Sequence, residues 1–517
     1  MKIPTIQLSL TLLAIALAGC EIKPADVYEL KLGESGVDKL ELNELSVTTQ
    51  KPNIVMVLAD DMSWFDVGAY HEEFDYVPRN AMTPNIDKLA EQGTLFKRAF
   101  TATAMCAVTR QQLYTGIYPV RNGAYGNHTR VNDGVKSAAH YFGDLGYRVG
   151  LAGKKHFAPL ESFPFEIVGE QDRSAEGETS FGIAQTREFI HQDSEKDVSE
   201  RRPFFLIVAS SSPHDPWTRG DRTQYPEDKL QVPSFLNDTP DVRRLLADYL
   251  AEVSDLDREV GLIEDELEKA NIVEKTIFIF TSEQGSVLPY GKWSNYDGGL
   301  RTAFIIRWPG RIAAGVKTDA MIEYVDVVPT LIDLVGGKVP FAHDGEPLDG
   351  KSFKPVLEGI EDEHKQYVYG IQTTYNIKDG SNYPIRSVRG QEFKLIHNLN
   401  YQNNYSNLIV ASPWYQRELH VEKTENKTNY SNFVKRPEFE LYNVKNDPFE
   451  RNNLIQDEQY KNVVSQLKTQ LAEWMNQQGD SGIPMETAVC RRENNPSGLC
   501  PGAVRQSNDS MFKKTFL

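Results

Sequence analysis

Three continuous apolar runs of strand length occur in the chain. They are residues 54–59 (IVMVLA), 204–209 (FFLIVA) and 276–281 (TIFIFT). An unbroken apolar run of this length is typical of a strand that is buried on both faces, as in a parallel sheet. The three runs therefore predict the central strands of a mostly parallel sheet.

A long amphipathic helix is predicted between the last two runs, over residues 242–270. Its apolar side chains recur at three- and four-residue steps, which places them on one helical face. They are Leu246, Tyr249, Val253, Leu256, Val260, Ile263 and Leu267. A strand, a helix and a second strand form a βαβ unit. The predicted fold class is therefore α/β, with a large mostly parallel sheet sandwiched by helices.

The pattern changes after about residue 375 to short segments of alternating polarity, such as 393–397 (FKLIH) and 439–442 (FELY). An apolar period of helical type follows over residues 460–477. These patterns predict a small antiparallel sheet with a packing helix. We therefore expect a main domain over residues 51–375 and a C-terminal α+β subdomain over residues 376–517.

The N-terminal segment has the features of an export signal. Lys2 precedes an apolar run over residues 8–18, which is too short to span a membrane. The tetrapeptide that ends at Cys20 (LAGC) resembles the lipobox of bacterial lipoproteins, in which this cysteine is acylated. We expect a lipoprotein signal peptide over residues 1–19, a polar tether over residues 20–50, and an exported bacterial lipoprotein. That protein would be anchored to the outer membrane, facing the periplasm or the cell surface. A plain secretory peptide cleaved nearby is the alternative.

Composition limits the partners of the protein. The chain has 517 residues, of which 40% are hydrophobic and 25% charged, as in an ordinary globular protein. Its formal net charge of −17 leaves no excess of positive charge for the phosphates of a nucleic acid. We therefore expect no nucleic-acid partner, and an anionic substrate would need a locally positive pocket.

Four cysteines are present, and the sequence suggests different roles for them. Cys20 is the predicted lipid site and Cys106 is the candidate catalytic residue. Cys490 and Cys500 lie ten residues apart in a loop rich in Asn, Pro and Gly. In an oxidising compartment these two would form a disulfide, and two free thiols are the alternative.

Pairs of polar residues directly follow the three apolar runs: Asp60 with Asp61, His214 with Asp215 a few residues on, and Glu283 with Gln284. The carboxyl ends of parallel strands meet at one edge of a sheet, where α/β proteins place their chemistry. Carboxylate and amide oxygens suit calcium or magnesium rather than zinc. A single pair of this kind is often a solvated turn or helix cap, but the recurrence favours a metal site.

Cationic residues occur in several loops that are marked by glycine or proline. A single lysine or histidine in a loop is usually solvated surface. If they converge, these residues would form a pocket for a small oxyanion such as sulfate or phosphate. They are Arg110, Lys154, His156, His214 and Lys292.

The segment from Cys106 to Arg110 (CAVTR) resembles the maturation signature of sulfatases. That signature is Cys or Ser, any residue, Pro, a small residue and Arg, and its first residue is oxidised to formylglycine. Val108 stands where proline is expected. Across residues 52–517 the chain resembles a type I sulfatase of the alkaline phosphatase superfamily. The matching segments are PNIVMVLADDM, TPNIDKLAEQG, LYTGIYP, GKKHF, PHDP, FTSEQG and KWSNYDGGLR.

The resemblance implies a specific site. Asp60, Asp61, Glu283 and Gln284 would hold one Ca²⁺ together with the formylglycine made from Cys106, which requires a formylglycine-generating or radical maturase. Glu283 and Gln284 replace the more usual Asp followed by Asn or His. The sulfate would be surrounded by Arg110, Lys154, His156, His214 and Lys292. A hydroxyl of hydrated formylglycine would attack sulfur, and His214 or Lys292 would protonate the leaving sugar.

C-terminal segments such as YPIRSVR, FKLIHNLN and FELYNVKNDPFERNNL resemble the N-sulfoglucosamine sulfohydrolases. That resemblance implies that the C-terminal sheet contributes to the substrate pocket. His128, Arg386 and His397 are second-tier candidates for binding the substrate, although each could equally be a structural residue. Lys292 and the following YDGG segment instead resemble the O-sulfatases.

Taken together, these features predict a carbohydrate O-sulfatase that acts on a terminal sugar of a sulfated polysaccharide. Algal polysaccharides such as ulvan or carrageenan are the class we expect, although no single residue selects them, and animal glycosaminoglycans are the open alternative. A sulfamidase acting on N-sulfoglucosamine in heparan sulfate is the first alternative. A phosphatase or phosphodiesterase is disfavoured, because the chain has only 10 histidines and none beside Asp60 or Glu283. An inactive, lipid-anchored glycan-binding protein is the alternative of another class, and it rests on Val108.

Overall fold

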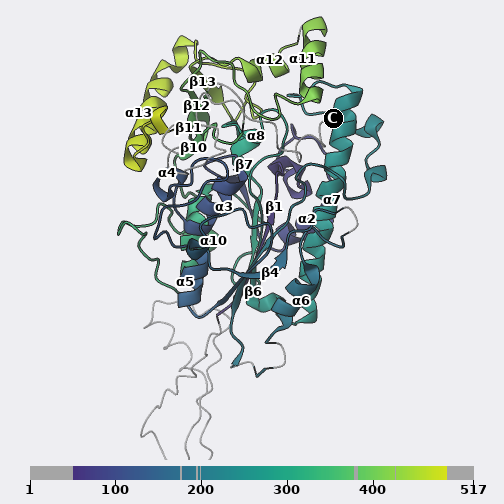
Figure 1. The fold of residues 1–517 in the computed structure, drawn as a ribbon, viewed down its shortest axis with the longest axis vertical. Coiled ribbons are helices and arrows are strands. Elements are labelled where there is room, and N and C mark those ends of the chain that lie inside the picture. The colour runs from purple at the N-terminus through teal and green to yellow at the C-terminus, as the bar shows by residue number, and fades with distance from the viewer. Residues whose placement is uncertain are drawn as a thin grey trace, which may run out of the picture. The chain divides into compact units, whose positions relative to one another are not determined.

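The apolar runs form the centre of a nine-stranded sheet (Figure 1). β1 (Asn53–Ala59) lies between β5 (Phe204–Ala209) and β6 (Thr276–Ser282) and pairs with both in parallel. The strand order is β4-β3-β5-β1-β6-β8-β2-β7, with β9 paired to β2. β8 pairs antiparallel with β6 and with β2. The central strands pair in parallel, so the sheet is mostly parallel, as predicted. The other strands are β2 (Thr94–Phe100), β3 (Arg148–Gly153), β4 (Glu166–Glu170), β7 (Arg301–Thr302), β8 (Phe304–Arg307) and β9 (Val316–Glu323).

The computed structural model describes residues 51–485, with gaps at 175–176, 194–195, 198–199, 378–381 and 426. Cys20, Cys490 and Cys500 lie outside these residues, so lipidation and the disulfide stay predictions. Within the described ranges, none of the helices combines the length and the apolar character that crossing a membrane requires.

Helices cover both faces of the sheet (Figure 1). Val55 and Val57 of β1 belong to one buried core with residues of α2, α6 and α7, whereas Ile54, Met56 and Leu58 belong to a second core with α3, α5 and α9. Because successive side chains of a strand point to opposite faces, an unbroken apolar run fills both cores. The helices are α2 (Pro84–Glu91), α3 (Cys106–Thr115), α4 (Pro119–Asn122), α5 (Ala138–Asp144), α6 (Ile183–His191), α7 (Pro240–Lys269), α8 (Asp297–Leu300), α9 (Val327–Leu334) and α10 (Lys354–Leu357).

The predicted βαβ unit is present, because α7 connects β5 to β6 and these two parallel strands flank β1. Thr239 caps α7 by accepting a hydrogen bond from the Val242 backbone amide, and Pro240 occupies its first turn. The apolar stripe predicted for this helix, from Leu246 to Leu267, is buried. The helix therefore fixes the spacing of the two strands whose ends carry His214 and Glu283.

A separate four-stranded antiparallel sheet forms from the C-terminal part of the chain, as predicted. α13 packs on it, with Leu467, Leu471 and Trp474 in one core with Leu395 and Leu441 of the sheet. Its first strand lies before residue 376, where the C-terminal subdomain was expected to begin. The elements are β10 (Val368–Gln372), β11 (Ile385–Arg389), β12 (Phe393–Asn398), β13 (Phe439–Asn443), α11 (Pro413–Glu425), α12 (Asn429–Val434) and α13 (Lys461–Gln478).

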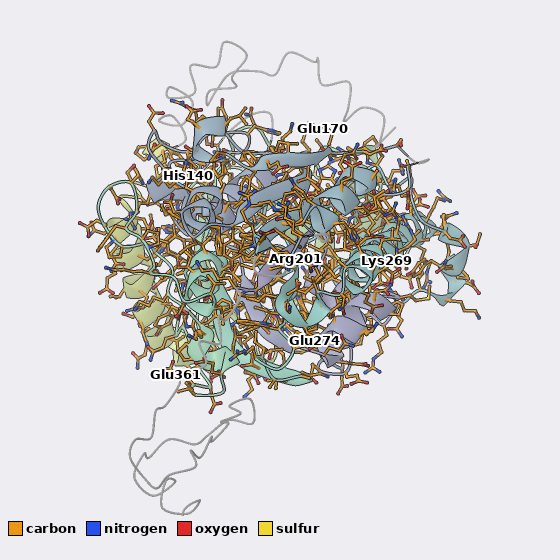
Figure 2. The ribbon with its side chains drawn as sticks, turned by 90° about the horizontal axis from the view of Figure 1, so that it is seen from below. His140, Glu170, Arg201, Lys269, Glu274 and Glu361 are labelled. Atoms are coloured by element: carbon orange, nitrogen blue, oxygen red, sulfur yellow. The ribbon has the colours of Figure 1, made fainter. Side chains whose placement is uncertain are left out.

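The two ends of the large sheet differ in their polar residues. Figure 2 shows the molecule from below and labels Arg201 and Glu274, which precede β5 and β6 in the chain. Glu274 is exposed at that end. At the opposite end of β6, Glu283 and Gln284 are fully buried. Buried polar groups carry a desolvation cost unless they have a partner or a ligand, so the carboxyl end of the sheet is the place to look for a site.

Candidate active site

The backbone of the site continues the hydrogen-bond ladder of the sheet beyond the strand ends. The Asp60 amide donates to the Ser212 carbonyl at 3.1 Å, the Glu283 amide to the Ala59 carbonyl at 2.9 Å, and the Lys154 amide to the Ala209 carbonyl at 2.9 Å. Residues after β1, β3, β5 and β6 are therefore held in fixed register. This ladder confirms that the polar pairs identified in the sequence meet at one edge.

Cys106 is the first residue of α3, a helix whose residues are all buried. Its Sγ atom lies 3.2 Å from Gln284 Nε2 and 3.9 Å from Asp61 Oδ1. Val108 lies in the first turn of α3 and in the hydrophobic core. First-turn amides have no partner within the helix, so the helix tolerates a proline at this position but does not require one. The departure from the sulfatase signature therefore does not disturb the local fold.

Asp60, Asp61, Cys106 and His214 form a group that could hold a metal ion, because one ligand atom of each lies within 4.8 Å of the others. Two further observations fit a cation. Asp60 Oδ1 and Gln284 Oε1 are buried oxygens without a hydrogen-bond partner among the described residues. Hard oxygens of this kind suit calcium or magnesium. The donor set thus fits the predicted site at Asp60, Asp61, Cys106 and Gln284.

Glu283, the remaining predicted metal ligand, has both carboxylate oxygens engaged by other side chains. Oε2 accepts from Arg110 Nε at 2.6 Å, and Oε1 accepts from Gln284 Nε2 at 2.9 Å. Burial and the neighbouring Asp60 charge raise the pKa of Glu283 well above its ordinary value, although Arg110 opposes the shift. In this geometry Glu283 anchors Arg110. Both oxygens of Asp61 are engaged as well, by Gln284 Nε2 at 2.7 Å and by Lys292 Nζ at 2.5 Å, so the ligand roles of Glu283 and Asp61 both stay predictions.

The predicted cations converge on the acidic cluster. Lys154 Nζ lies 2.5 Å from Asp60 Oδ2, and Lys292 Nζ lies 2.5 Å from Asp61 Oδ2. Burial by itself would raise the pKa of Asp60, but the charges of Lys154, His214 and Arg110 outweigh it, so the pKa lies well below its ordinary value. The acidic side chains of Asp60, Asp61 and Glu283 thus face the cations Arg110, Lys154 and Lys292 in a buried site. A charge set of this kind can accept both a metal ion and an oxyanion.

His214 lies at the outer side of this cluster. Its Nε2 atom is 3.4 Å from Asp61 Oδ2 and 3.4 Å from Lys292 Nζ. Its Nδ1 atom lies 2.6 Å from the Asp215 carbonyl oxygen, which can only accept a hydrogen bond, and 3.0 Å from Arg173 Nη2, which can only donate one. The other ring nitrogen, Nε2, faces the cluster and can take or give a proton.

His156 and His128 form a pair at the rim, with Nε2 of His156 2.8 Å from Nδ1 of His128. Both residues have left-handed backbones, with φ of 50° and 59° respectively, a conformation that is costly for residues other than glycine. Burial and the neighbouring Lys154 charge hold the pKa of His156 well below its ordinary value. The structure thus joins the second-tier candidate His128 to the predicted pocket.

The C-terminal part of the chain supports this rim. Thr373 Oγ1 donates to the Tyr125 carbonyl at 2.6 Å, and Asn376 Nδ2 donates to the Asn127 carbonyl at 3.1 Å. The Ile371 amide donates to the Ala102 carbonyl at 2.7 Å, in the loop that leads to Cys106. The small sheet therefore braces two loops of the site, in line with the contribution that the resemblance implied.

Arg386 and His397, the other second-tier candidates, pack within the C-terminal part of the chain. Arg386 is fully buried, forms an ion pair with Asp480 through Nε and Nη2, and donates from Nη1 to two backbone carbonyls. His397 stacks on Phe439 with ring centres 4.2 Å apart. Burial, then the charges of Lys468 and Arg386, lower the pKa of His397 to about 4. Both contact sets indicate structural roles.

Arg173 is a site residue that the sequence did not indicate. Its Nη2 atom lies 3.0 Å from His214 Nδ1 and donates to the Asp215 carbonyl. It lies in a polar loop after β4 without apolar periodicity or a recognisable motif. Only the tertiary fold brings this loop against His214.

Comparison with known families and proteins agrees with this geometry. The sulfatase family profile matches residues 52–337, and the profile of the C-terminal region of N-sulphoglucosamine sulphohydrolase matches residues 287–412. An ulvan-active sulfatase of Formosa agariphila is 33% identical over 466 residues, which cover 86% of this chain and 85% of the relative. The human N-sulphoglucosamine sulphohydrolase is 28% identical over 483 residues, which cover 86% of this chain and 94% of that enzyme.

Solved structures share the fold. One is a complex with its substrate D-glucosamine-2-N,6-O-disulfate, at a TM-score of 0.60 and 21% identity, and the match covers 84% of this chain and 99% of the other. Another is described as Ps i-CgsB in complex with k-i-k-neocarrahexaose, at a TM-score of 0.61 and 22% identity, covering 86% and 98% of the two chains. At these identities the likeness concerns the fold.

Proposed function

The chain belongs to the sulfatase family and is a sulfuric ester hydrolase, and on that premise we propose that it is a carbohydrate O-sulfatase. Its substrate would be a sulfate ester on a terminal sugar of a sulfated polysaccharide, with algal polysaccharides such as ulvan or carrageenan as the class to test first. The ulvan-active relative from Formosa agariphila supports this class. The observation that carries the proposal is Cys106, buried among Asp61, Gln284 and the cations of the sheet edge.

We extend the proposal to the maturation of Cys106 to formylglycine and to one bound Ca²⁺. Asp60, Asp61, Glu283, Gln284 and the matured residue 106 would hold the ion. When bound, the ion would withdraw electrons from the sulfate group, and hydrated formylglycine would offer a hydroxyl as the nucleophile. The partnerless oxygens of Asp60 and Gln284 support the ion, and the buried position at the start of α3 supports the nucleophile.

The cations of the chain would bind and orient the sulfate. Lys154 and Arg110 meet at the site, since Arg110 Nη1 donates to the Lys154 carbonyl at 3.2 Å. Arg110 Nη2 is buried without a hydrogen-bond partner among the described residues, 3.9 Å from Asp60 Oδ1. An unpaired guanidinium nitrogen is a strong donor for a sulfate oxygen. His156 and Lys292 would complete the donor set from the two sides.

We assign the general acid to His214. The side chain of His214 is 12% exposed and that of Lys292 is 3% exposed, so the imidazole lies nearer the mouth, where the leaving sugar must extend. Its Nδ1 atom lies against the Asp215 carbonyl and Arg173, and Nε2 faces the cluster, where it would hold the proton. A sugar alkoxide is a poor leaving group unless it is protonated, so this proton matters most for unactivated esters.

An N-sulfoglucosamine sulfamidase is the second candidate. It is favoured by the match of residues 287–412 to the C-terminal profile of that enzyme and by the human relative. Its substrate carries sulfate on nitrogen, and the two candidates therefore separate cleanly by substrate. Sulfate release from N-sulfoglucosamine, without release from any O-sulfated sugar, would replace our first choice.

The test is a measurement of free sulfate from defined oligosaccharides of ulvan, carrageenan and heparan type, each in two chain lengths. The purified full chain is compared with Cys106→Ala as the matched control. In parallel, the mass of the tryptic peptide with Cys106 shows whether the thiol has become an aldehyde. An unmodified thiol in an active preparation, or phosphate release that exceeds sulfate release on matched aryl esters, would contradict the proposal.

We also propose that the protein is exported and held at a membrane by acylated Cys20. The proposal rests on the LAGC segment after a short apolar run. In a bacterial host, Cys20→Ala should move the protein from the membrane fraction to the soluble exported fraction. Membrane retention of that variant would contradict the lipid anchor.

A further inference from the structure

Arg173 presents an exposed guanidinium group beside the general acid. Only its Nη2 atom makes the contacts with His214 and the Asp215 carbonyl. Within the described ranges, its Nε and Nη1 atoms have no hydrogen-bond partner, and no carboxylate lies within 4.0 Å of it. The Nε and Nη1 atoms of Arg173 are therefore still available as hydrogen-bond donors.

Several partly exposed arginines of the chain have acidic partners, in a protein whose net charge is −17. Arg222 pairs with Glu227 and Asp248 at 2.5 Å each, and Arg243 pairs with Asp238 at 2.5 Å. Arg173 has no such partner among the described residues, so its charge is open to an anionic ligand beside His214.

The loop that carries Arg173 is braced from beneath. Arg219 is 7% exposed and donates from Nη1 to the Ser174 carbonyl at 2.7 Å and from Nη2 to the Gly177 carbonyl at 3.1 Å. Its Nε atom donates to Asp255 of α7 at 2.8 Å. A buried, charge-assisted anchor of this kind holds the backbone at Ser174 and Gly177. The chain is thus anchored next to Arg173, whose side chain contacts His214 and the Asp215 carbonyl.

The acidic neighbour of Arg173 is turned away from it. Asp172 Oδ1 accepts from the Ser174 amide at 2.8 Å, and the Asp172 amide donates to the Ser180 carbonyl at 2.9 Å. The Asp172 carboxylate is therefore occupied by the turn of its own loop. This arrangement leaves Arg173 without a carboxylate partner among the described residues.

From this geometry we propose that Arg173 is a second anion subsite. It binds a carboxylate or a further sulfate on the sugar that carries the scissile sulfate, or on the adjacent sugar. The reason is position: the leaving oxygen meets Nε2 of His214, and Arg173 lies against Nδ1 of the same ring. This inference rests on the proposed carbohydrate sulfatase function and narrows its substrates to sugars with a second negative charge.

The test compares Arg173→Ala and Arg173→Lys with the unaltered enzyme and with Arg244→Ala, a control on α7 whose guanidinium pairs with Asp241 at 3.3 Å. The substrates are 4-nitrophenyl sulfate, a neutral monosulfated disaccharide, and the same disaccharide with either a uronate carboxylate or a second sulfate. We expect Arg173→Ala to raise KM about 10- to 100-fold for the substrates with a second anion, as for the loss of one charged hydrogen bond. KM for the other two should change less than about 3-fold.

The outcomes separate the sources of the anion. A KM effect confined to the uronate substrate identifies a carboxylate, and one confined to the disulfated substrate identifies a second sulfate. An equal fall in kcat on every substrate would overturn the subsite, because Arg173 would then act only by positioning His214. An unchanged KM on both doubly charged substrates would overturn it as well.

A binding measurement keeps this inference separate from the proposed activity. In a Cys106→Ala background, calorimetry compares the Kd of the neutral and doubly charged disaccharides with and without Arg173→Ala. We expect the preference for the second anion to fall about 10-fold or more when Arg173 is removed. If the chain releases no sulfate but loses this preference, the proposed function fails and the subsite stands. If the preference never depends on Arg173, the subsite is wrong whatever the activity.

Discussion

Two fully buried arginines, one beside each sheet, differ in whether every nitrogen of the guanidinium group has a partner. Arg110 lies at the carboxyl edge of the large sheet, and its Nη2 atom has no hydrogen-bond partner among the described residues. Arg386 lies in the small sheet, and Nε, Nη1 and Nη2 all donate to Asp480 or to backbone carbonyls. Arg110 thus has one nitrogen without a partner, whereas all three nitrogens of Arg386 have partners within the protein.

The difference separates a site from a structural ion pair. A buried polar atom without a partner costs free energy, and a bound ligand is one way to compensate that cost. Around Arg110 the leftover atoms include Asp60 Oδ1 and Gln284 Oε1. The charge of Arg386 is instead paired with the carboxylate of Asp480. Changes at the first cluster should therefore reduce activity, and changes at the second should reduce stability.

The largest effect is expected at Cys106, the proposed source of the nucleophile. Cys106→Ala should lower the rate of sulfate release by at least about 10³-fold, as when the nucleophile of a hydrolase is removed. Thermal unfolding should change little, because the Cys106 thiol makes only long contacts with Asp61 and Gln284. If Cys106→Ala keeps activity within 10-fold of the unaltered enzyme, the cluster around Arg110 is not the active site, and its polar atoms without partners have another role.

The next effect concerns two histidines, one in each region. His214→Ala should lower kcat about 10²- to 10⁴-fold for a sugar sulfate, and much less for an aryl sulfate whose leaving group needs no proton. His397→Ala, the matched control in the small sheet, should leave both rates within about 3-fold, because it stacks on Phe439 away from the cluster. Equal losses on both substrates for His214→Ala would contradict its role as the acid.

A stability effect is expected at the second cluster. Arg386→Ala leaves Asp480 as a buried charge without its partner, and removal of one member of such a pair costs about 3–5 kcal/mol of the free energy of unfolding. Chemical denaturation measures this loss, and kcat of the folded fraction should stay within about 3-fold. A variant that unfolds normally but loses activity would place Arg386 in the substrate pocket after all.

Metal removal should act on the first cluster alone. Dialysis against a chelator should abolish most activity and lower the melting temperature, and Ca²⁺ should restore both. An ion at a hundredfold excess over its Kd stabilises a protein by about 2.7 kcal/mol. Asp60→Asn should remove the response to Ca²⁺, whereas Arg386→Ala should keep it. Equal melting temperatures with and without Ca²⁺ would contradict the metal site.

The sequence predicted the framework of the fold, for a physical reason. Apolar periods mark β1, β5, β6 and α7 directly, and parallel strands must bring their carboxyl ends together. That rule alone joins Asp60 to Glu283, more than 200 residues apart in the chain. The position of the site therefore followed from local pattern and sheet geometry.

Pairing between side chains did not follow from the sequence in the same way. Arg386 and His397 carry the residue types of a binding site, but the partner of Arg386 is Asp480, 94 residues further on. The engagement of Glu283 by Arg110 is likewise a tertiary contact. Arg173 lies in a loop without apolar periodicity, so no local signal pointed to His214. Only packing decides which charges are satisfied.

The smallest effect is a difference in acid sensitivity that reports on the small sheet. His397 has a pKa of about 4 in the folded protein because burial and the charges of Lys468 and Arg386 disfavour its protonated form. The unfolded chain binds this proton at a higher pH, near 6.5, so folding stability falls as the pH drops from about 6.5 towards 4.

His397→Gln keeps a polar, uncharged group, removes this titration, and should reduce the loss of melting temperature between pH 7 and pH 5 by about 1–2 °C. Scanning calorimetry at the two pH values checks the shift. Because the site cluster is untouched, the rate of sulfate release should keep the pH profile of the unaltered enzyme, and a moved profile would place His397 in contact with the substrate.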